Sequence, residues 1–382
     1  MKVAILISPY KFSVLDLVEK RADALTTSLQ QIVIDEIKKS SRRALPFSRF
    51  MELSLYHPDW GYYQTKQMKL GKEGDFFTNA HVGDLVGKVL GRVFHKWSHK
   101  PYVIVEMGPG DGRLTEAVIG SLLQLGVSPD MIQFFLVETS DYMRQCQQKR
   151  LSGLPISCKW ASHILELPKV PFAIVYSNEL VDAFPVHRIC QVGENLQEVC
   201  VTFDEDQEIF HEVLAPLSTT ALQHFIQDFE IKLTEGQVIE VNLQAYDWLK
   251  ELASWMETGY LLTIDYGGTQ EELFNSVRKN GTIRYYRHHQ ILDDPYSLFG
   301  EIDMTSHVNF SSLMKWGEEL EFQTVGFQTQ GAFLLDQGIL DLVPVVPASN
   351  PFSPEAKQMR AMQQLIHPDG MGEVFRVLVQ KK

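Results

Sequence analysis

The stretch VIVEMGPGDGRLTEAV, residues 103–118, decides the fold. It begins as an apolar run typical of a buried strand, and this run ends in Glu106. A loop with three glycines follows, Gly108, Gly110 and Gly112, and then a helix-like pattern begins. Glycines at such a turn allow the backbone to lie directly against a ligand. The acid at the mouth of the loop argues against a phosphate as that ligand.

Short apolar runs alternate with amphipathic helical patterns from about residue 100 to 180. The runs are continuous, which fits strands buried on both faces, as in a parallel sheet covered by helices. We therefore predict an α/β fold with a doubly wound core. The four runs are 102–105, 134–137, 172–176 and 260–264.

A carboxylate follows each of these runs. They are Glu106, Glu138, Glu179 and Asp265. Ligands of open α/β sheets bind at the carboxyl ends of the strands. A single acid here could simply favour a helix N-terminus, but four together predict a site that accepts a cation.

The glycine spacing distinguishes between cofactors. A dinucleotide loop needs GxGxxG with an acid about 20 residues on; here the order is GxGxG, and Glu138 lies 30 residues after Gly108. S-adenosylmethionine carries a sulfonium, an ammonium and a ribose diol, which suit carboxylates and bare backbone. We predict this cofactor, with Asn178 as an amide at its edge. The other predicted contacts from these motifs are Glu106, Gly108, Pro109, Gly110, Gly112 and Glu138.

Composition limits the partners. The 382 residues carry a net charge of −13, which argues against nucleic acid and favours a cationic ligand or a basic protein segment. The four cysteines form no CxxC pair, and the histidines lack the spacing of a metal site, so no metal is expected. His307 is expected to be structural.

No apolar run is long enough to span a membrane, and no signal or transit peptide is evident, so we expect a cytoplasmic protein. The oligomeric state stays open.

Nine motifs are similar to those of the MidA-like family of class I methyltransferases. This is the family of the mitochondrial complex I assembly methyltransferase and its bacterial relatives. The motifs follow the family's order and cover nearly everything from about Ile32 to the end. They are PFSRFMELSLYHPDWGYY (46–63), GDFFTNAHVGDLVG (74–87), VEMGPGDGRL (105–114), LVETS (136–140), YSNELVDAFPVHRI (176–189), IDYGG (264–268), TIRYYRHH (282–289), GEIDMTSHVNFSSL (300–313) and HPDGMGEVFRVL (367–378).

The resemblance implies a Rossmann-like sheet of seven strands whose last strand, 373–380, is antiparallel. It implies that Thr78 contacts the cofactor and that the substrate is an arginine on a respiratory complex I subunit. The chain departs from the family at TNAH, where Ser-Pro-Glu is frequent, and at Ala161, where a histidine is usual.

The chemistry of such a transfer points to particular acids. A guanidinium is protonated almost everywhere, so its methylation needs carboxylates that hold it and accept charge. Glu179, Asp182 and Asp265 are the predicted catalytic residues; each could instead cap a helix or a turn. A scaffold that has lost catalysis, a small-molecule methyltransferase and an NAD-dependent oxidoreductase remain as alternatives, the last disfavoured by the loop spacing.

The organisation of the chain follows from these patterns. We expect a helical N-terminal region that contributes to the active site, a core interrupted by a hairpin and a helix, and a second insertion on the substrate side. The aromatic motif YHPDWGYY (56–63) fits either core packing or a lid. The predicted boundaries are 1–98 for the N-terminal region, 99–190 and 258–382 for the core halves, 191–257 for the first insertion and about 269–315 for the second.

Overall fold

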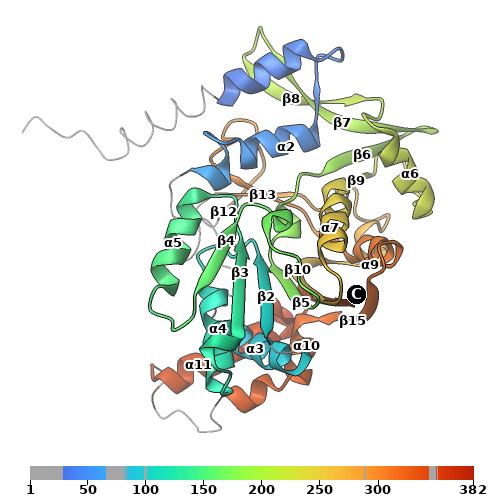
Figure 1. Ribbon diagram of the computed structural model, residues 1–382. Helices are drawn as coiled ribbons and strands as arrows, with labels where there is room; N and C mark the ends of the chain where they lie inside the picture. Colours follow the sequence, from blue (N-terminus) through green and yellow to red (C-terminus); the bar gives the residue numbers. More distant parts are fainter. Residues whose placement is uncertain are drawn as a thin grey trace, which may run out of the picture.

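The computed structural model describes residues 29–65, 82, 84–98, 101–287, 290–343, 350 and 352–382 (Figure 1). Thr78, predicted to contact the cofactor, lies outside the described residues, as do His288 and His289.

One large sheet forms the core. Its path is β15-β16-β10-β5-β2-β3-β4, with β16 antiparallel to both neighbours and the other pairs parallel. The predicted antiparallel last strand is thus confirmed. A two-residue strand, β14 (Val308–Asn309), pairs with β10 as an eighth strand beside the predicted seven. The path strands are β2 (Tyr102–Met107), β3 (Ile132–Val137), β4 (Cys158–Ala161), β5 (Ala173–Asn178), β10 (Gly259–Gly268), β15 (Gln323–Thr329) and β16 (Phe375–Lys381).

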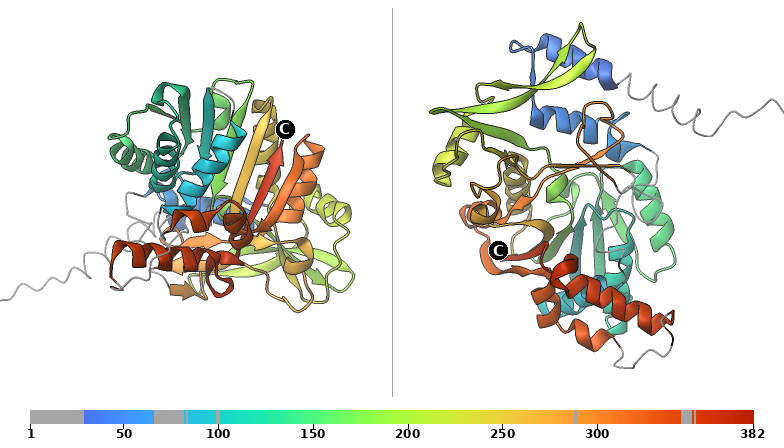
Figure 2. Two further views of the ribbon diagram at one scale, coloured as in Figure 1. Left: turned by 90° about the horizontal axis from the view of Figure 1, so that it is seen from below. Right: turned by 180° about the vertical axis from the view of Figure 1, so that it is seen from behind.

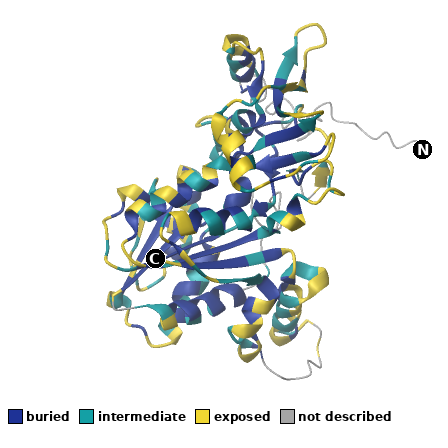
Figure 3. Cartoon of the chain, turned by 90° about the vertical axis from the view of Figure 1, so that its right-hand side faces the viewer, coloured by how far each residue is buried: buried dark blue, intermediate teal, exposed yellow. Residues whose placement is uncertain are grey.

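Helices cover both faces of this sheet (Figure 2). β2 is buried along its whole length because its side chains alternate between two apolar clusters. One cluster joins the sheet to α3 (Leu85–Trp97), α4 (Arg113–Gln124), α10 (Gln330–Asp336) and α11 (Pro354–Ile366). The other joins it to α6 (Thr220–Asp228), α7 (Leu243–Trp255) and α9 (Phe310–Glu319). Figure 3 shows the central strands of the main sheet as buried and the outer helix faces as largely exposed.

A second sheet and the N-terminal helices form a layer above the main sheet in Figure 1. A helix at residues 29–39 and α2 (Phe47–Tyr56) share a third apolar cluster with this sheet and with a small third one. The second sheet contains β1 (Leu45–Pro46), β6 (His187–Val192), β7 (Asn195–Asp204), β8 (Ile209–Ala215) and β9 (Val238–Val241). The third contains β11 (Arg284–Arg287), β12 (Gln290–Leu292) and β13 (Asp303–Thr305).

The first insertion differs from its predicted range of 191–257 at both ends. β6 already belongs to the second sheet, so the departure from the core begins by residue 187. α7 packs on the main sheet, because Trp248, Leu249 and Leu252 on one of its faces are buried in the core cluster.

Among the described residues, no helix combines the length and the apolar character needed to cross a membrane.

The remaining elements are α5 (Asp141–Leu151), α8 (Gln270–Leu273), η1 (Tyr62–Gln64), η3 (Pro129–Met131), η4 (Ile164–Glu166), η5 (Val181–Ala183), η6 (Ile339–Leu342) and η7 (Pro368–Gly372).

Candidate functional site

A cavity of about 1280 Å³ lies at the carboxyl ends of β2, β3 and β5, beneath the layer of N-terminal helices. The glycine loop forms one part of its wall. Tyrosines and acids from α2, η1, η5, β11 and β13 form another part. A single cavity therefore joins the predicted cofactor loop to a second group of polar side chains from distant parts of the chain.

The glycine loop exposes backbone to the cavity. Gly108, Gly110 and Gly112 have φ values of 66°, 54° and 79°, which favour glycine. Gly108 donates to the Val137 carbonyl at 3.0 Å, and a Cβ added to it would lie 2.8 Å from Leu180 Cδ1. Gly108, Pro109 and Gly110 line the cavity, whereas Gly112 caps the start of α4.

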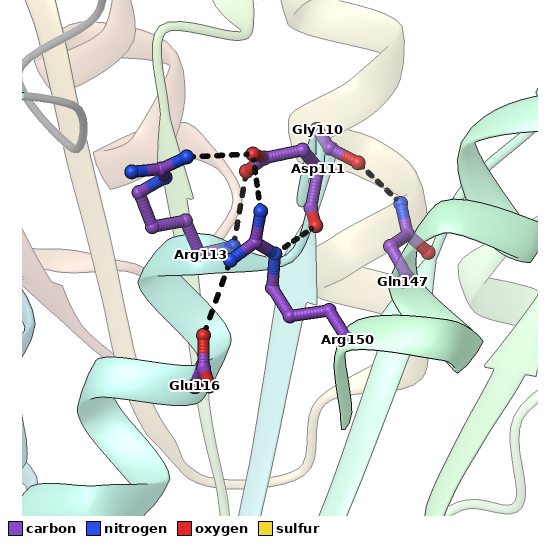
Figure 4. Close-up of polar contacts among 6 residues, drawn as sticks. All are labelled: Gly110, Asp111, Arg113, Glu116, Gln147 and Arg150. Atoms are coloured by element: carbon purple, nitrogen blue, oxygen red, sulfur yellow. Dashed lines mark hydrogen bonds and ion pairs between the residues drawn. The ribbon is translucent and has the colours of Figure 1, made fainter. Parts of the chain in front are cut away.

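Side chains of α5 form hydrogen bonds to this loop. The Gln147 amide nitrogen donates to the Gly110 carbonyl at 2.7 Å and to Glu138 Oε2 at 3.1 Å. Its amide oxygen accepts from Trp160 Nε1 at 2.8 Å. One turn on, Arg150 donates to the Asp111 carbonyl and to Asp111 Oδ2, both at 2.9 Å (Figure 4). Sequence reasoning missed these hydrogen bonds, because α5 has no apolar or catalytic pattern that would single out Gln147.

The first two predicted carboxylates lie at this end. Glu106 is 2% exposed and accepts hydrogen bonds from Tyr176 Oη at 2.6 Å and from Thr115 Oγ1. Burial raises its pKa to about 7, against the effect of these hydrogen bonds. Glu138 accepts from the Ser140 N–H at 2.8 Å, and burial raises its pKa as well. Both line the cavity.

A sharp turn after β5 carries the next predicted residues. Glu179 has φ 52°, and its N–H donates to the Ile264 carbonyl at 2.9 Å. The Asn178 amide nitrogen donates to Glu179 Oε1 at 3.2 Å, while Asn178 Oδ1 is buried with no hydrogen-bond partner among the described residues. Both side chains line the cavity.

Asp265 holds this turn in place through hydrogen bonds to its backbone. It is fully buried and does not line the cavity. Its Oδ2 accepts from the N–H groups of residues 180, 181 and 182 at 3.2, 2.9 and 3.3 Å, and its Oδ1 accepts from the Tyr266 N–H at 3.0 Å. Asp265 therefore differs from the other two predicted catalytic acids, Glu179 and Asp182, which line the cavity.

Asp182 faces the cavity from the same turn. Its side chain is almost fully buried, and its Oδ1 has no hydrogen-bond partner among the described residues. Burial raises its pKa well above the ordinary value, and the charge of Asp265 adds to this, while a hydrogen bond from Tyr266 opposes it.

Two tyrosines from α2 and η1 bring their hydroxyl groups into this cavity. Tyr56 Oη donates to the Ala183 carbonyl at 2.8 Å, and Tyr63 Oη donates to Asp303 Oδ1 at 2.6 Å. The aromatic motif therefore serves two purposes: Tyr62 is buried in the core cluster, while Tyr56 and Tyr63 line the cavity. His307 also lines it; burial and nearby arginines lower its pKa to about 4, so it is neutral at pH 7.

The model of one protein family matches residues 85–328, and its description is "Putative S-adenosyl-L-methionine-dependent methyltransferase". The chain belongs to this family. This methyltransferase is 30% identical to "Protein arginine methyltransferase NDUFAF7, mitochondrial" of Danio rerio, over 86% of the chain and 81% of that relative. It is 27% identical to the protein of the same name from Xenopus laevis, over 97% and 87%.

A solved structure resembles the whole chain. It is a superfamily member from Burkholderia thailandensis bound to S-adenosyl-homocysteine, with a TM-score of 0.86 and 27% identity, covering 95% of this chain and 94% of that one. S-adenosyl-L-methionine is therefore the cofactor of this methyltransferase, as the glycine spacing predicts.

The residues of the cavity fit that cofactor. The loop offers backbone without side chains at Gly108 and Gly110, and Glu138 lies at the end of the second strand, where a ribose diol would be bound. Asn178 Oδ1 is a buried acceptor that needs a donor. Six of the predicted contacts line this one cavity, namely Glu106, Gly108, Pro109, Gly110, Glu138 and Asn178.

Proposed function

We propose that this methyltransferase methylates an arginine side chain of a protein. The names of the Danio and Xenopus relatives support this substrate class. The observation that carries the proposal is the charge of the cavity. Its described lining includes nine Asp or Glu residues and one arginine, Arg284. Such a lining favours a cationic acceptor beside the cofactor.

Two of these acids suit the acceptor nitrogen. When bound, S-adenosyl-L-methionine supplies an electrophilic methyl group, whose bond to sulfur breaks as a bond to the acceptor nitrogen forms. The guanidinium must be held in line and must lose a proton. Glu179 and Asp182 lie on one turn at the cavity wall and can accept its N–H groups. Because burial raises the pKa of Asp182, its carboxylate is, when ionised, a stronger base than an ordinary carboxylate.

Other residues hold that turn in place. Asp265 binds three consecutive N–H groups of the turn, and Asn242 Nδ2 donates to the Val181 carbonyl at 3.1 Å. The Ser306 N–H donates to the Asp182 carbonyl at 2.9 Å. We propose Asp265 as a positioning residue, because its oxygens are occupied by backbone donors and it does not line the cavity.

The test is transfer of a labelled methyl group from S-adenosyl-L-methionine into protein. The first acceptors to offer are subunits of respiratory complex I, which the resemblance implies. Mass spectrometry then locates the methyl group, and we expect it on arginine. Label on lysine, glutamine or a small molecule would reject the arginine assignment. Cofactor binding without any transfer would favour the scaffold alternative.

A further inference from the structure

We propose that Asp303 and Tyr63 complete a guanidinium-selective subsite on the walls of the cavity formed by α2, η1, η5, β11 and β13. This inference rests on the proposed arginine substrate and deepens it. Neither residue follows a strand of the main sheet, and Tyr63 lies outside the residues that the family model matches. The subsite therefore belongs to the layers added to the methyltransferase core.

Two acids of this subsite are buried. Asp182 and Asp303 are 3% and 2% exposed, and both line the cavity. The charge of Asp303 is one of the causes that raise the pKa of Asp182. Two buried carboxylates near each other are costly to ionise unless a positive group lies between them. Arg284 lines the cavity too, but it is exposed, and its Nη1 donates to its neighbouring carbonyl of Ile283 at 2.7 Å.

A tyrosine hydroxyl orients one of these acids by a hydrogen bond. Tyr63 donates to Asp303 Oδ1 at 2.6 Å, and burial followed by the charge of Asp303 raises the Tyr63 pKa well above its ordinary value. Tyr63 thus remains protonated and keeps donating. Oδ1 of Asp182, which has no hydrogen-bond partner among the described residues, is a further acceptor in the subsite. A bound group must therefore offer several N–H donors.

The tyrosines also favour a flat cation. Tyr56, Tyr63, Tyr266 and Tyr286 all line the cavity, and the rings of Tyr56 and Tyr63 have centroids 5.4 Å apart, tilted by 32°. A guanidinium is planar, stacks on aromatic rings and is weakly hydrated, whereas an ammonium is a compact and strongly hydrated charge. The walls therefore favour arginine over lysine, and the buried acids disfavour a neutral amide.

Three distant segments fix the geometry of the subsite. Tyr56 Oη binds the Ala183 carbonyl, directly after Asp182, and the Ser306 N–H binds the Asp182 carbonyl. These hydrogen bonds connect α2, and the residue directly after β13, to the turn η5. Tyr63 and Asp303 are consequently held against the same turn that carries Asp182.

The experiment measures probe binding to the full chain saturated with S-adenosylhomocysteine. Calorimetry compares Nα-acetyl-arginine amide with Nα-acetyl-lysine amide, and we expect the lysine probe to bind at least roughly 10-fold more weakly, as loss of a bidentate, charge-assisted contact implies. Asp303→Asn and Tyr63→Phe should each weaken binding of the arginine probe, the former by roughly 10- to 100-fold. Affinity for S-adenosylhomocysteine should not change.

Asp293→Asn is the matched control. It is the same substitution at an exposed position that precedes β13 and does not line the cavity, so arginine binding should stay as in the parent. Equal affinity for the two probes, no binding of either, or parental arginine binding in both variants overturns the subsite. Arginine binding without methylation of any protein arginine instead leaves the subsite standing and rejects the proposed function.

Discussion

Glu179, Asp182 and Asp265 lie around one turn, yet their carboxylates have different surroundings. Asp265 is surrounded by backbone donors, while one oxygen of Asp182 has no hydrogen-bond partner in the described part of the chain and Asp182 faces the cavity. Glu179 sits at φ 52°, a conformation that non-glycine residues seldom adopt and that is often found at functional sites. At this scale, the hydrogen bonds of each oxygen decide which acid is available to a ligand.

Glu179→Gln should keep the shape of the side chain and remove its charge. If Glu179 neutralises the guanidinium in the transition state, turnover should fall roughly 100- to 1000-fold, or about 3 to 4 kcal/mol. Cofactor affinity, measured by calorimetry, should change much less. The exposed Glu257→Gln serves as control. An unchanged rate for Glu179→Gln would move the catalytic role to Asp182.

At the scale of elements, one helix links the glycine loop to Glu138. Gln147 on α5 binds Gly110 and Glu138 together, with Trp160 on its other side. The indole N–H only donates and the other two groups only accept, so the amide has one orientation that satisfies all three. α5 is therefore a positioning element, although its sequence carries no apolar stripe.

Gln147→Glu tests that assignment through its pH dependence. The new carboxylate cannot donate to Gly110 and repels Glu138, so affinity for S-adenosylhomocysteine should fall by roughly 10- to 100-fold at pH 8. Protonation restores one donor, so affinity relative to the parent should recover as pH decreases. Gln148→Glu, the exposed neighbour, is the control and should show neither effect. A loss that is the same at every pH would indicate a general structural defect instead.

At the scale of the molecule, the core and the added layers divide the site between them. The main sheet supplies the glycine loop, the carboxylates at its strand ends and Tyr266, while α2, η1, β11 and β13 supply Tyr56, Tyr63, Tyr286 and Asp303. Forming such a closed cavity buries acids, and this burial affects the stability of the whole fold. Glu106 illustrates the cost, because its pKa of about 7 in the fold lies above the ordinary value of 4.5.

The raised pKa of Glu106 makes the free energy of unfolding decrease as pH rises. Below pH 4.5 the Glu106 carboxyl is protonated in the folded and unfolded states alike. As pH rises towards 7, the unfolded chain ionises it first, so the free energy of unfolding falls, by about 3 kcal/mol in total. Glu106→Gln should remove this decrease. Urea unfolding without cofactor, between pH 5 and pH 8, should show the variant gaining stability relative to the parent as pH rises.

Glu318→Gln, an exposed acid, provides the reference for that comparison and should follow the parent at every pH. A difference between Glu106→Gln and the parent that does not vary with pH would show that the Glu106 carboxyl has an ordinary pKa in the fold.

Local patterns of the sequence determined the parallel strands of the sheet and the class of cofactor; these patterns are continuous apolar runs, glycine spacing and the residue type after each run. The antiparallel last strand was implied by the resemblance of the motifs to a known family, and the fold confirms it. The tertiary structure alone decided that Asp265 supports the turn while Asp182 faces the cavity, and it brought Gln147 to the glycine loop. It also brought Tyr63 to Asp303 across 240 residues of chain. No local pattern encodes such pairs, because the packing of separate layers creates them.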